Sequence, residues 1–238
     1  AILHFECPAQ NIAYADRQGN IALWGQGQYV NKWKGQGKYV MNGSDSATLW
    51  GKLIPMRENP HVLNPQQGFV SSANQNVTDS TYPYWYDGSF VELRAWRINQ
   101  RLNEIQKATV KDMFTLQNDT YSTLAANVLP VMLRHVGEVH GSGAAYIDLL
   151  KKWNYYLDIQ GEAPTVFQVW WSYFYREVWQ QKFKHVPNDL LPLPERTMQL
   201  LIADTGTQGK VADFKKAAVS SFKKATDSLS KLDRNSMK

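Results

Sequence analysis

Length, composition and charge limit the classes of protein to which this chain can belong. Its 238 residues are 43% hydrophobic and 13% aromatic, enough for one large domain or two small ones with a packed core. The net charge of +5 comes largely from lysines between Lys210 and Lys238, where interspersed aspartates favour a solvated helix face over a nucleic-acid patch. No apolar run reaches the ~20 residues of a transmembrane helix, so neither nucleic acid nor a membrane is an expected partner.

The start of the chain resembles the middle of a protein. It opens on AILHFECPAQ, without Met and without the basic and apolar regions of a signal peptide. The single cysteine, Cys7, excludes an intrachain disulfide. We therefore expect an internal piece of a longer protein.

The first part of the chain, to about residue 88, has the turn residues and alternation of short β-strands. Two apolar runs, Ile12–Ala15 and Ile21–Trp24, flank the polar loop Asp16–Asn20, in which Gly19 can adopt a positive φ angle. This arrangement predicts a β-hairpin.

A repeat and a turn follow the hairpin. The segment Gly25–Val30 recurs imperfectly as Gly35–Val40, which predicts a surface excursion with short strands, because two copies are too few for a solenoid. Asn64-Pro65 and the glycine after it are typical of a turn. A short strand is then expected to begin at Phe69 and to end at Asn74.

From about residue 88 the apolar period changes from two to 3.6, which predicts helices. Pro130 is expected to kink or divide its helix, and the prolines from Pro187 to Pro194 predict an extended connector. The sequence thus indicates an α+β chain with a β-rich part, residues 1–98, and a mainly helical part, residues 99–238. The predicted helices lie at Val91–Ile98, Thr109–Gln117, Ser122–Val136, Ala144–Leu157, Thr165–Phe183 and Val211–Leu232.

Three polar residues are candidates for catalysis, although each also has an ordinary structural explanation. The Asn74 amide is a good donor to a developing oxyanion, because it has no proton to lose; most asparagines at strand ends instead satisfy a turn. Arg94 and Arg97 lie three residues apart on the next helix. An arginine there can orient an asparagine carbonyl or form a surface ion pair.

Metal ligation is only weakly indicated. His135 and His140 are the one close pair among the five histidines, and a spacing of five residues is poor for a single helical face. Gly137 and Gly141 also favour a helix end there. Phosphate-binding loops, nucleophile elbows and zinc-protease motifs are absent from the sequence.

Four segments match the patterns of a known family. They are the hairpin Pro8–Ile21, with Asn-x-x-Tyr-Ala-Asp and Gly-Asn-Ile, the run Trp50–Asn74, with Asn-Pro-x-x-Gly and Ala-Asn, the Arg-x-x-Arg-Ile of Arg94–Ile98, and Gln117–Ser122. Together they resemble the penicillin acylase family of N-terminal-nucleophile amidohydrolases. The resemblance is specific over about residues 8–125 and diffuse beyond.

The resemblance implies a fold and a reaction. Members of this family are made as one precursor that cleaves itself to expose a Ser, Cys or Thr, whose own α-amine acts as the base. Their fold is a four-layer αββα sandwich with helical insertions, so residues 1–98 would be part of that core and residues 99–238 a helical region of the same large chain. Their substrates are acyl amides: penicillins, cephalosporin side chains and acyl-homoserine lactones. No cofactor is implied for the chemistry, and the location implied is periplasmic or secreted.

The family's functional residues transfer to single positions here. Asn74 falls on the oxyanion-hole asparagine, Arg97 on the arginine that helps to position it, and Arg94 on the neighbouring arginine. Asp87 lies near a calcium-ligating aspartate of some members, which implies a structural calcium ion in the parent protein. Ala1 does not match the processed start, so the nucleophile is expected N-terminal to this chain. The implied partners are the small chain and the nucleophile-bearing segment of the same precursor, and this chain alone should be inactive.

Two other functions remain open. A non-catalytic module that binds glycan or protein would use exposed aromatic rings as a stacking platform. An assembly role, which is compatible with the amidohydrolase hypothesis, would dock the aromatic helix Thr165–Phe183 and the helix at residues 209–233 on a missing partner segment. The platform residues would be Trp24, Tyr29, Trp33, Tyr39 and Trp50.

Overall fold

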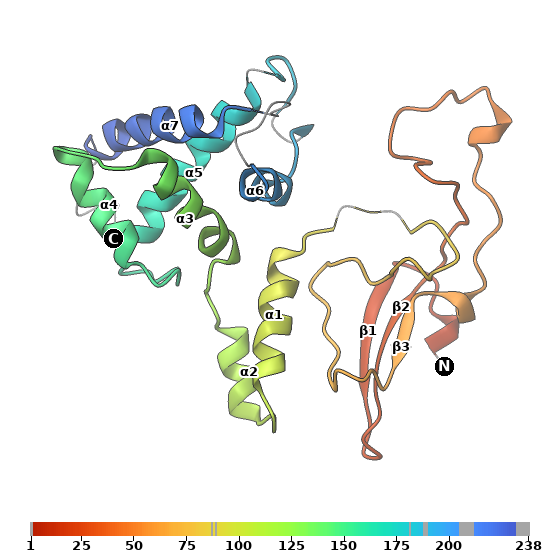
Figure 1. Ribbon diagram of the computed structural model, residues 1–238. Helices are drawn as coiled ribbons and strands as arrows, with labels where there is room; N and C mark the ends of the chain where they lie inside the picture. The colour runs from red at the N-terminus through yellow and green to blue at the C-terminus, as the bar shows by residue number, and fades with distance from the viewer. Residues whose placement is uncertain are drawn as a thin grey trace. The chain divides into compact units, whose positions relative to one another are not determined.

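The computed structural model describes residues 2–86, 88, 90–180, 182–187, 190–204 and 212–231 (Figure 1). Contacts divide the chain into two compact units, residues 1–112 (unit 1) and residues 113–238 (unit 2). A three-stranded sheet lies in unit 1 and helices make up unit 2, which confirms the α+β class. Within the described ranges, no helix is long and apolar enough to cross a membrane.

Unit 1 is built on an antiparallel sheet of order β1-β2-β3. Strands β1 (Gln10–Ala15) and β2 (Ile21–Gln26) pair with Ile12 opposite Trp24, which confirms the predicted hairpin. Strand β3 (His61–Leu63) pairs with the other edge of β2. Three residues are too few to give β3 a recognisable sequence pattern, so it is found only in the structure.

One carboxylate organises the hairpin turn. Asp16 accepts hydrogen bonds from the Asn20 side chain and from the backbone N–H groups of Asn20 and Gln18, at 2.8–2.9 Å. These bonds, that of the Asn20 side chain first, lower the pKa of Asp16 below its ordinary value. Gly19 supplies the positive φ of 88° that lets the chain reverse.

Between β2 and β3 the chain makes a long excursion with little regular structure (orange in Figure 1). It contains two single-turn 3-10 helices, η2 (Ser46–Thr48) and η3 (Met56–Glu58). Of the short strands expected here, the described part of the excursion has only a bridge between Val30 and Leu53.

Hydrogen bonds from buried side-chain amides, and not a ladder of paired strands, stabilise this excursion. The Gln36 side chain is 3% exposed, and its Nε2 donates to the Leu49 carbonyl at 2.9 Å. Asn59 is 1% exposed, and its Nδ2 donates to the Gly27 carbonyl at 2.9 Å. Two side chains thus satisfy backbone carbonyls that a regular sheet would have paired with N–H groups.

The prediction of a strand from Phe69 to Asn74 is wrong. This segment is irregular and bends at Ala73 and Asn74. The Ala73 N–H donates to the Gln75 Oε1 at 2.6 Å, so a nearby side chain, and not a neighbouring strand, satisfies the backbone.

Helices follow from residue 93. Helix α1 continues past residue 98, the predicted boundary between the β-rich part and the helical part. A short 3-10 helix, η1 (Ile2–His4), precedes the sheet. The described α-helices are α1 (Leu93–Glu104), α2 (Val110–Gln117), α3 (Thr123–Val136), α4 (Ser142–Lys152), α5 (Glu162–Gln180), α6 (Pro194–Ile202) and α7 (Phe214–Leu229).

Two prolines in unit 2 lie in or at helices. Pro130 lies inside α3 and does not divide it, and Val128, Leu129 and Met132 beside it are fully buried. Pro194 begins α6, where the missing N–H would have had no partner in the helix. The extended connector predicted to include Pro194 is therefore too long.

The core of unit 2 forms around α5, which packs on α4 and α7. Its aromatic side chains are largely buried: Phe167, Trp170, Trp171 and Phe174 are all at most 4% exposed. The apolar faces of α5 and α7 cover one another inside this unit. These four buried rings are therefore not available for the assembly role.

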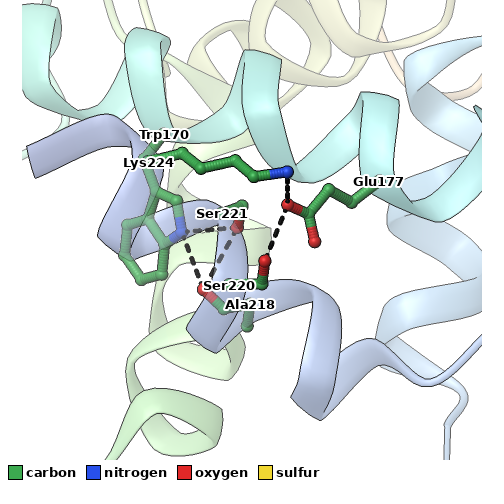
Figure 2. A network of polar contacts seen from close by, with 6 residues as sticks. All are labelled: Trp170, Glu177, Ala218, Ser220, Ser221 and Lys224. Atoms are coloured by element: carbon green, nitrogen blue, oxygen red, sulfur yellow. Dashed lines mark hydrogen bonds and ion pairs between the residues drawn. The ribbon is translucent and has the colours of Figure 1, made fainter. Parts of the chain in front are cut away.

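A polar seam accompanies the apolar contact between α5 and α7. The Trp170 Nε1 donates to the Ser221 Oγ at 3.1 Å and to the Ala218 carbonyl at 3.3 Å (Figure 2). Glu177 of α5 also accepts hydrogen bonds from two residues of α7, from the Lys224 Nζ at 2.6 Å and from the Ser220 Oγ at 2.9 Å. Buried donors in this seam are therefore paired, as a stable interior requires.

Candidate functional site

The candidate oxyanion donor, Asn74, lies between β3 and α1 in an irregular segment, residues 71–76, which we call the bend. Its side chain is exposed, and its φ angle of 64° is in the left-handed region. Asparagine tolerates this region better than most residues, because its short polar side chain can bond locally. The bend thus leaves the side chain accessible.

Arg94, in the first turn of α1, orients the Asn74 amide. The Arg94 Nη2 donates to the Asn74 Oδ1 at 2.6 Å. A guanidinium group has donors only, so the amide oxygen must face Arg94 and the Nδ2 must face the other way. Among the residues that the structure describes, the Nδ2 has no hydrogen-bond partner.

The backbone of the bend is also attached to the start of α1. The Val91 N–H donates to the Asn74 carbonyl at 3.2 Å. The Asn76 N–H donates to the Glu92 Oε1 at 3.1 Å. Asn74 is therefore held through its main chain and its side chain together.

Asn74 lines an open pocket of about 430 Å³ in unit 1. One part of the lining is polar and the other is aromatic. The lining residues are Ala9, Gln10, Asn11, Tyr29, Ser72, Asn74, Gln75, Tyr86, Gly88 and Phe90.

The aromatic wall of this pocket is a packed cluster. The Tyr86 ring stacks on Phe90 with centroids 5.6 Å apart, and it meets Tyr29 at 5.9 Å. Burial, followed by the nearby Tyr86, raises the pKa of Tyr29 above its ordinary value, so its phenol is harder to ionise than that of an exposed tyrosine. Tyr86 and Phe90 were not among the predicted site residues. Their signal is the alternation of tyrosines in YPYWYDGSF, which places Tyr82, Tyr84 and Tyr86 two residues apart.

The two arginines have different contacts. The hydrogen bond to Asn74 comes from Arg94, whereas the resemblance assigned the positioning role to Arg97. Arg97 lies three residues, about 4.5 Å, further along α1. Its Nη1 donates to the Gln100 Oε1 at 3.2 Å. The role of Arg97 at the site stays a prediction.

The predicted calcium ligand, Asp87, lies outside the described residues, so the structure does not place it. Among the residues that are described, no three His, Cys, Asp or Glu side chains gather in a way that could hold a metal ion. The helix end predicted near His135 is confirmed: α3 ends at Val136, and Gly137 caps it with a φ of 70°.

The aromatic residues of the alternative binding platform do not share one environment. Trp24 stacks on the His61 ring at 3.9 Å, and Tyr29 packs on Tyr86 in the pocket wall. Three others are more than half exposed on the excursion: Trp33, Tyr39 and Trp50. A platform of all five is therefore not present.

An oriented amide in a pocket is the kind of arrangement by which acyl-transfer enzymes stabilise an oxyanion. The chain belongs to the penicillin amidase family, whose sequence model matches residues 1–237.

Two relatives match parts of the chain. Over 119 residues, 50% of this chain, it is 28% identical to the acyl-homoserine lactone acylase QuiP of Pseudomonas syringae pv. tomato. Over 73 residues, 31% of this chain, it is 33% identical to penicillin G acylase of Escherichia coli. The matches span only 14% and 8% of those two proteins.

A solved structure has the same fold. The thermostable penicillin G acylase from Alcaligenes faecalis superposes with a TM-score of 0.69 and 17% identity. The alignment covers 97% of this chain and 48% of that one. This chain therefore has the architecture of about half of an acylase chain.

Proposed function

We propose that this chain is part of an amidohydrolase that cleaves acyl amides, and that Asn74 donates to the oxyanion of the reaction. The observation that carries the proposal is the Asn74 amide, oriented by Arg94 at 2.6 Å in the wall of an open pocket. Membership of the penicillin amidase family supports the hydrolase class. The nucleophile, a Ser, Cys or Thr at a processed N-terminus, would come from a segment outside this chain.

In the proposed reaction the nucleophile attacks the scissile carbonyl, whose oxygen takes up negative charge. The Asn74 N–H₂ donates to that oxygen and has no proton to lose at neutral pH. The positive charge of Arg94 on the amide oxygen polarises Asn74 further, so the donor strengthens as the oxyanion develops. Arg94 thus acts through Asn74 and does not need to touch the substrate.

The substrate class follows from the family. We place it among acyl amides of the penicillin, cephalosporin side-chain or acyl-homoserine lactone type; the first and the last of these are the compounds after which two relatives are named. Hydrolysis would require the small chain and the nucleophile-bearing segment, so this chain alone should be inactive. A periplasmic or secreted location and a structural calcium ion in the parent protein are part of the same proposal.

The test is substitution of Asn74 in the complete protein. Asn74→Ala removes the oxyanion donor, and we expect kcat to fall by about 10²–10³-fold, the usual cost of losing one such donor. Active sites are counted with a covalent reagent for the nucleophile, so that kcat refers to correctly processed enzyme. The control is Asn103→Ala, an exposed asparagine on α1 outside the pocket lining. Full activity in Asn74→Ala would contradict the proposal.

A further inference from the structure

Besides the bond from Asn76 to Glu92 and those of Asn74 itself, two side-chain hydrogen bonds attach the bend. The Ser71 Oγ donates to the Asn99 Oδ1 on α1 at 2.6 Å. The Asn11 Nδ2 on β1 donates to the Ser72 Oγ at 3.0 Å. Adjacent serines are therefore fastened in two directions, one to the helix and one to the sheet.

The bend runs antiparallel along α1. Ser71 meets Asn99, and Asn76 meets Glu92, the residue that precedes the helix. With a rise of 1.5 Å per residue, the two ends of this contact are about 10 Å apart on the helix. Asn74 lies between them and bonds to Arg94. The bend is thus fixed at both ends, with the donor in the middle.

An attachment of this kind is needed because the bend has no strand partner. Arg94 fixes which way the amide faces, but a single hydrogen bond leaves the distance and tilt of the Nδ2 free to vary. A donor is effective only within about 2.7–3.1 Å of the oxyanion. Small movements of the bend therefore matter more for catalysis than for folding.

We infer that Ser71 and Asn99 are positioning residues, whose hydrogen bond sets the place of the Asn74 amide against the substrate carbonyl. The inference rests on the proposed function, because it concerns how Asn74 is held for that reaction. Both residues act through Asn74 and neither lines the pocket. Their contribution should therefore appear in the rate of the chemical step and not in the binding of substrate.

The experiment uses Ser71→Ala and Asn99→Ala in the complete protein, with active sites counted as for Asn74. We expect kcat to fall by about tenfold in each variant, less than the ~10²-fold that a 1 Å misplacement can cost. KM and the midpoint of thermal unfolding should stay unchanged. Ser71→Thr keeps the hydroxyl group and should restore most of the rate. The two alanine changes together should cost no more than one, since both break the same bond.

The matched control is Ser44→Ala. Ser44 also donates from its Oγ to an asparagine, the Asn42 Oδ1 at 2.7 Å, but at an exposed site on the excursion. This variant should keep the wild-type kcat. A similar loss in Ser44→Ala would mean that any serine–asparagine bond in unit 1 matters equally, which would overturn the inference.

A double-mutant cycle separates this inference from the proposed function. In an Asn74→Ala background, Ser71→Ala should have no further effect on kcat, because the group that it positions is gone. An equal loss in both backgrounds, or a change in KM alone, would show that Ser71 does not act through Asn74. If Asn74→Ala itself kept full activity, the proposed oxyanion role would fail. If only Ser71→Ala and Asn99→Ala kept full activity, the positioning role alone would fail.

Discussion

The two units of this chain stabilise their interiors by different means. In the described part of unit 2, helices α3 to α7 bury apolar side chains against one another, with Trp170 and Phe174 fully inaccessible. Unit 1 buries few apolar side chains and relies on amides such as Gln36 and Asn59, which bond to backbone carbonyls. Apolar packing is tolerant of sequence and shapes a rigid body, whereas directed hydrogen bonds hold loops in one geometry. The candidate site lies in the unit that uses directed bonds.

The largest effect that this comparison predicts is in unit 2. Trp170→Ala removes a fully buried ring that packs edge-on against Phe222 at 4.9 Å and donates to Ser221. We expect a loss of about 3–5 kcal/mol in the free energy of unfolding, the usual result of such a cavity. Urea unfolding measures the loss, and hydrogen exchange locates it: the peptides of α5 and α7 should exchange faster.

Trp50→Ala is the matched control for that change. Trp50 lies on the excursion of unit 1 and is 77% exposed. Its removal should change the free energy of unfolding by no more than about 0.5 kcal/mol. If the two tryptophans cost the same, the contrast between an apolar and a polar interior would not hold.

The next effect is in unit 1 and tests its buried amides. Asn59→Ala removes the donor to the Gly27 carbonyl and leaves that oxygen unpaired. The expected cost is about 1–3 kcal/mol, with faster hydrogen exchange in the excursion and in β2. The control is Asn127→Ala on α3, where an exposed Nδ2 also donates to a backbone carbonyl, that of Thr123, at 2.8 Å. That change should cost less than about 0.5 kcal/mol, and a larger loss there would remove the distinction between the units.

The same contrast explains how much of the fold the sequence predicts. Helical periodicity predicts the positions of α2, α3, α5 and α7 to within a few residues, because the apolar residues of a buried helix face recur every three or four positions in the sequence. The hairpin is equally readable, since Gly19 and Asp16 make their turn locally. The irregular excursion and the bend cannot be predicted in this way, because hydrogen bonds such as that from Asn59 to Gly27 join residues far apart in the chain.

The candidate site was predictable only in part. The family pattern singles out Asn74 and both arginines and assigns the positioning role to Arg97, whereas the observed hydrogen bond to Asn74 comes from Arg94. Which arginine reaches the asparagine depends on where α1 begins relative to the bend. The attachments of Ser71 to Asn99 and of Asn11 to Ser72 have no sequence signal, since each joins two unremarkable polar residues across a gap of 28 or 61 positions.

The smallest predicted effect is a pH dependence of unit 2. Burial is the first cause that lowers the pKa of His135 below its ordinary value of 6.5, and its buried Nε2 has no hydrogen-bond partner among the described residues. The unfolded chain therefore binds a proton at a higher pH than the folded chain does. The stability linked to this group is fully present above pH 6.5 and is lost as the pH falls through the lower folded value.

Hydrogen exchange of the α3 peptides between pH 8 and pH 5, corrected for the intrinsic exchange rate, measures this dependence. Protection should decrease on acidification in the wild-type chain and should decrease less in His135→Gln, which cannot take up the proton. Because His135 is partly exposed, the difference should be well below the cost of Trp170→Ala. Equal losses in both proteins would show that other groups control the acid sensitivity of α3. A loss confined to the wild-type chain would show that even the apolar unit depends on one polar group that its packing leaves unpaired.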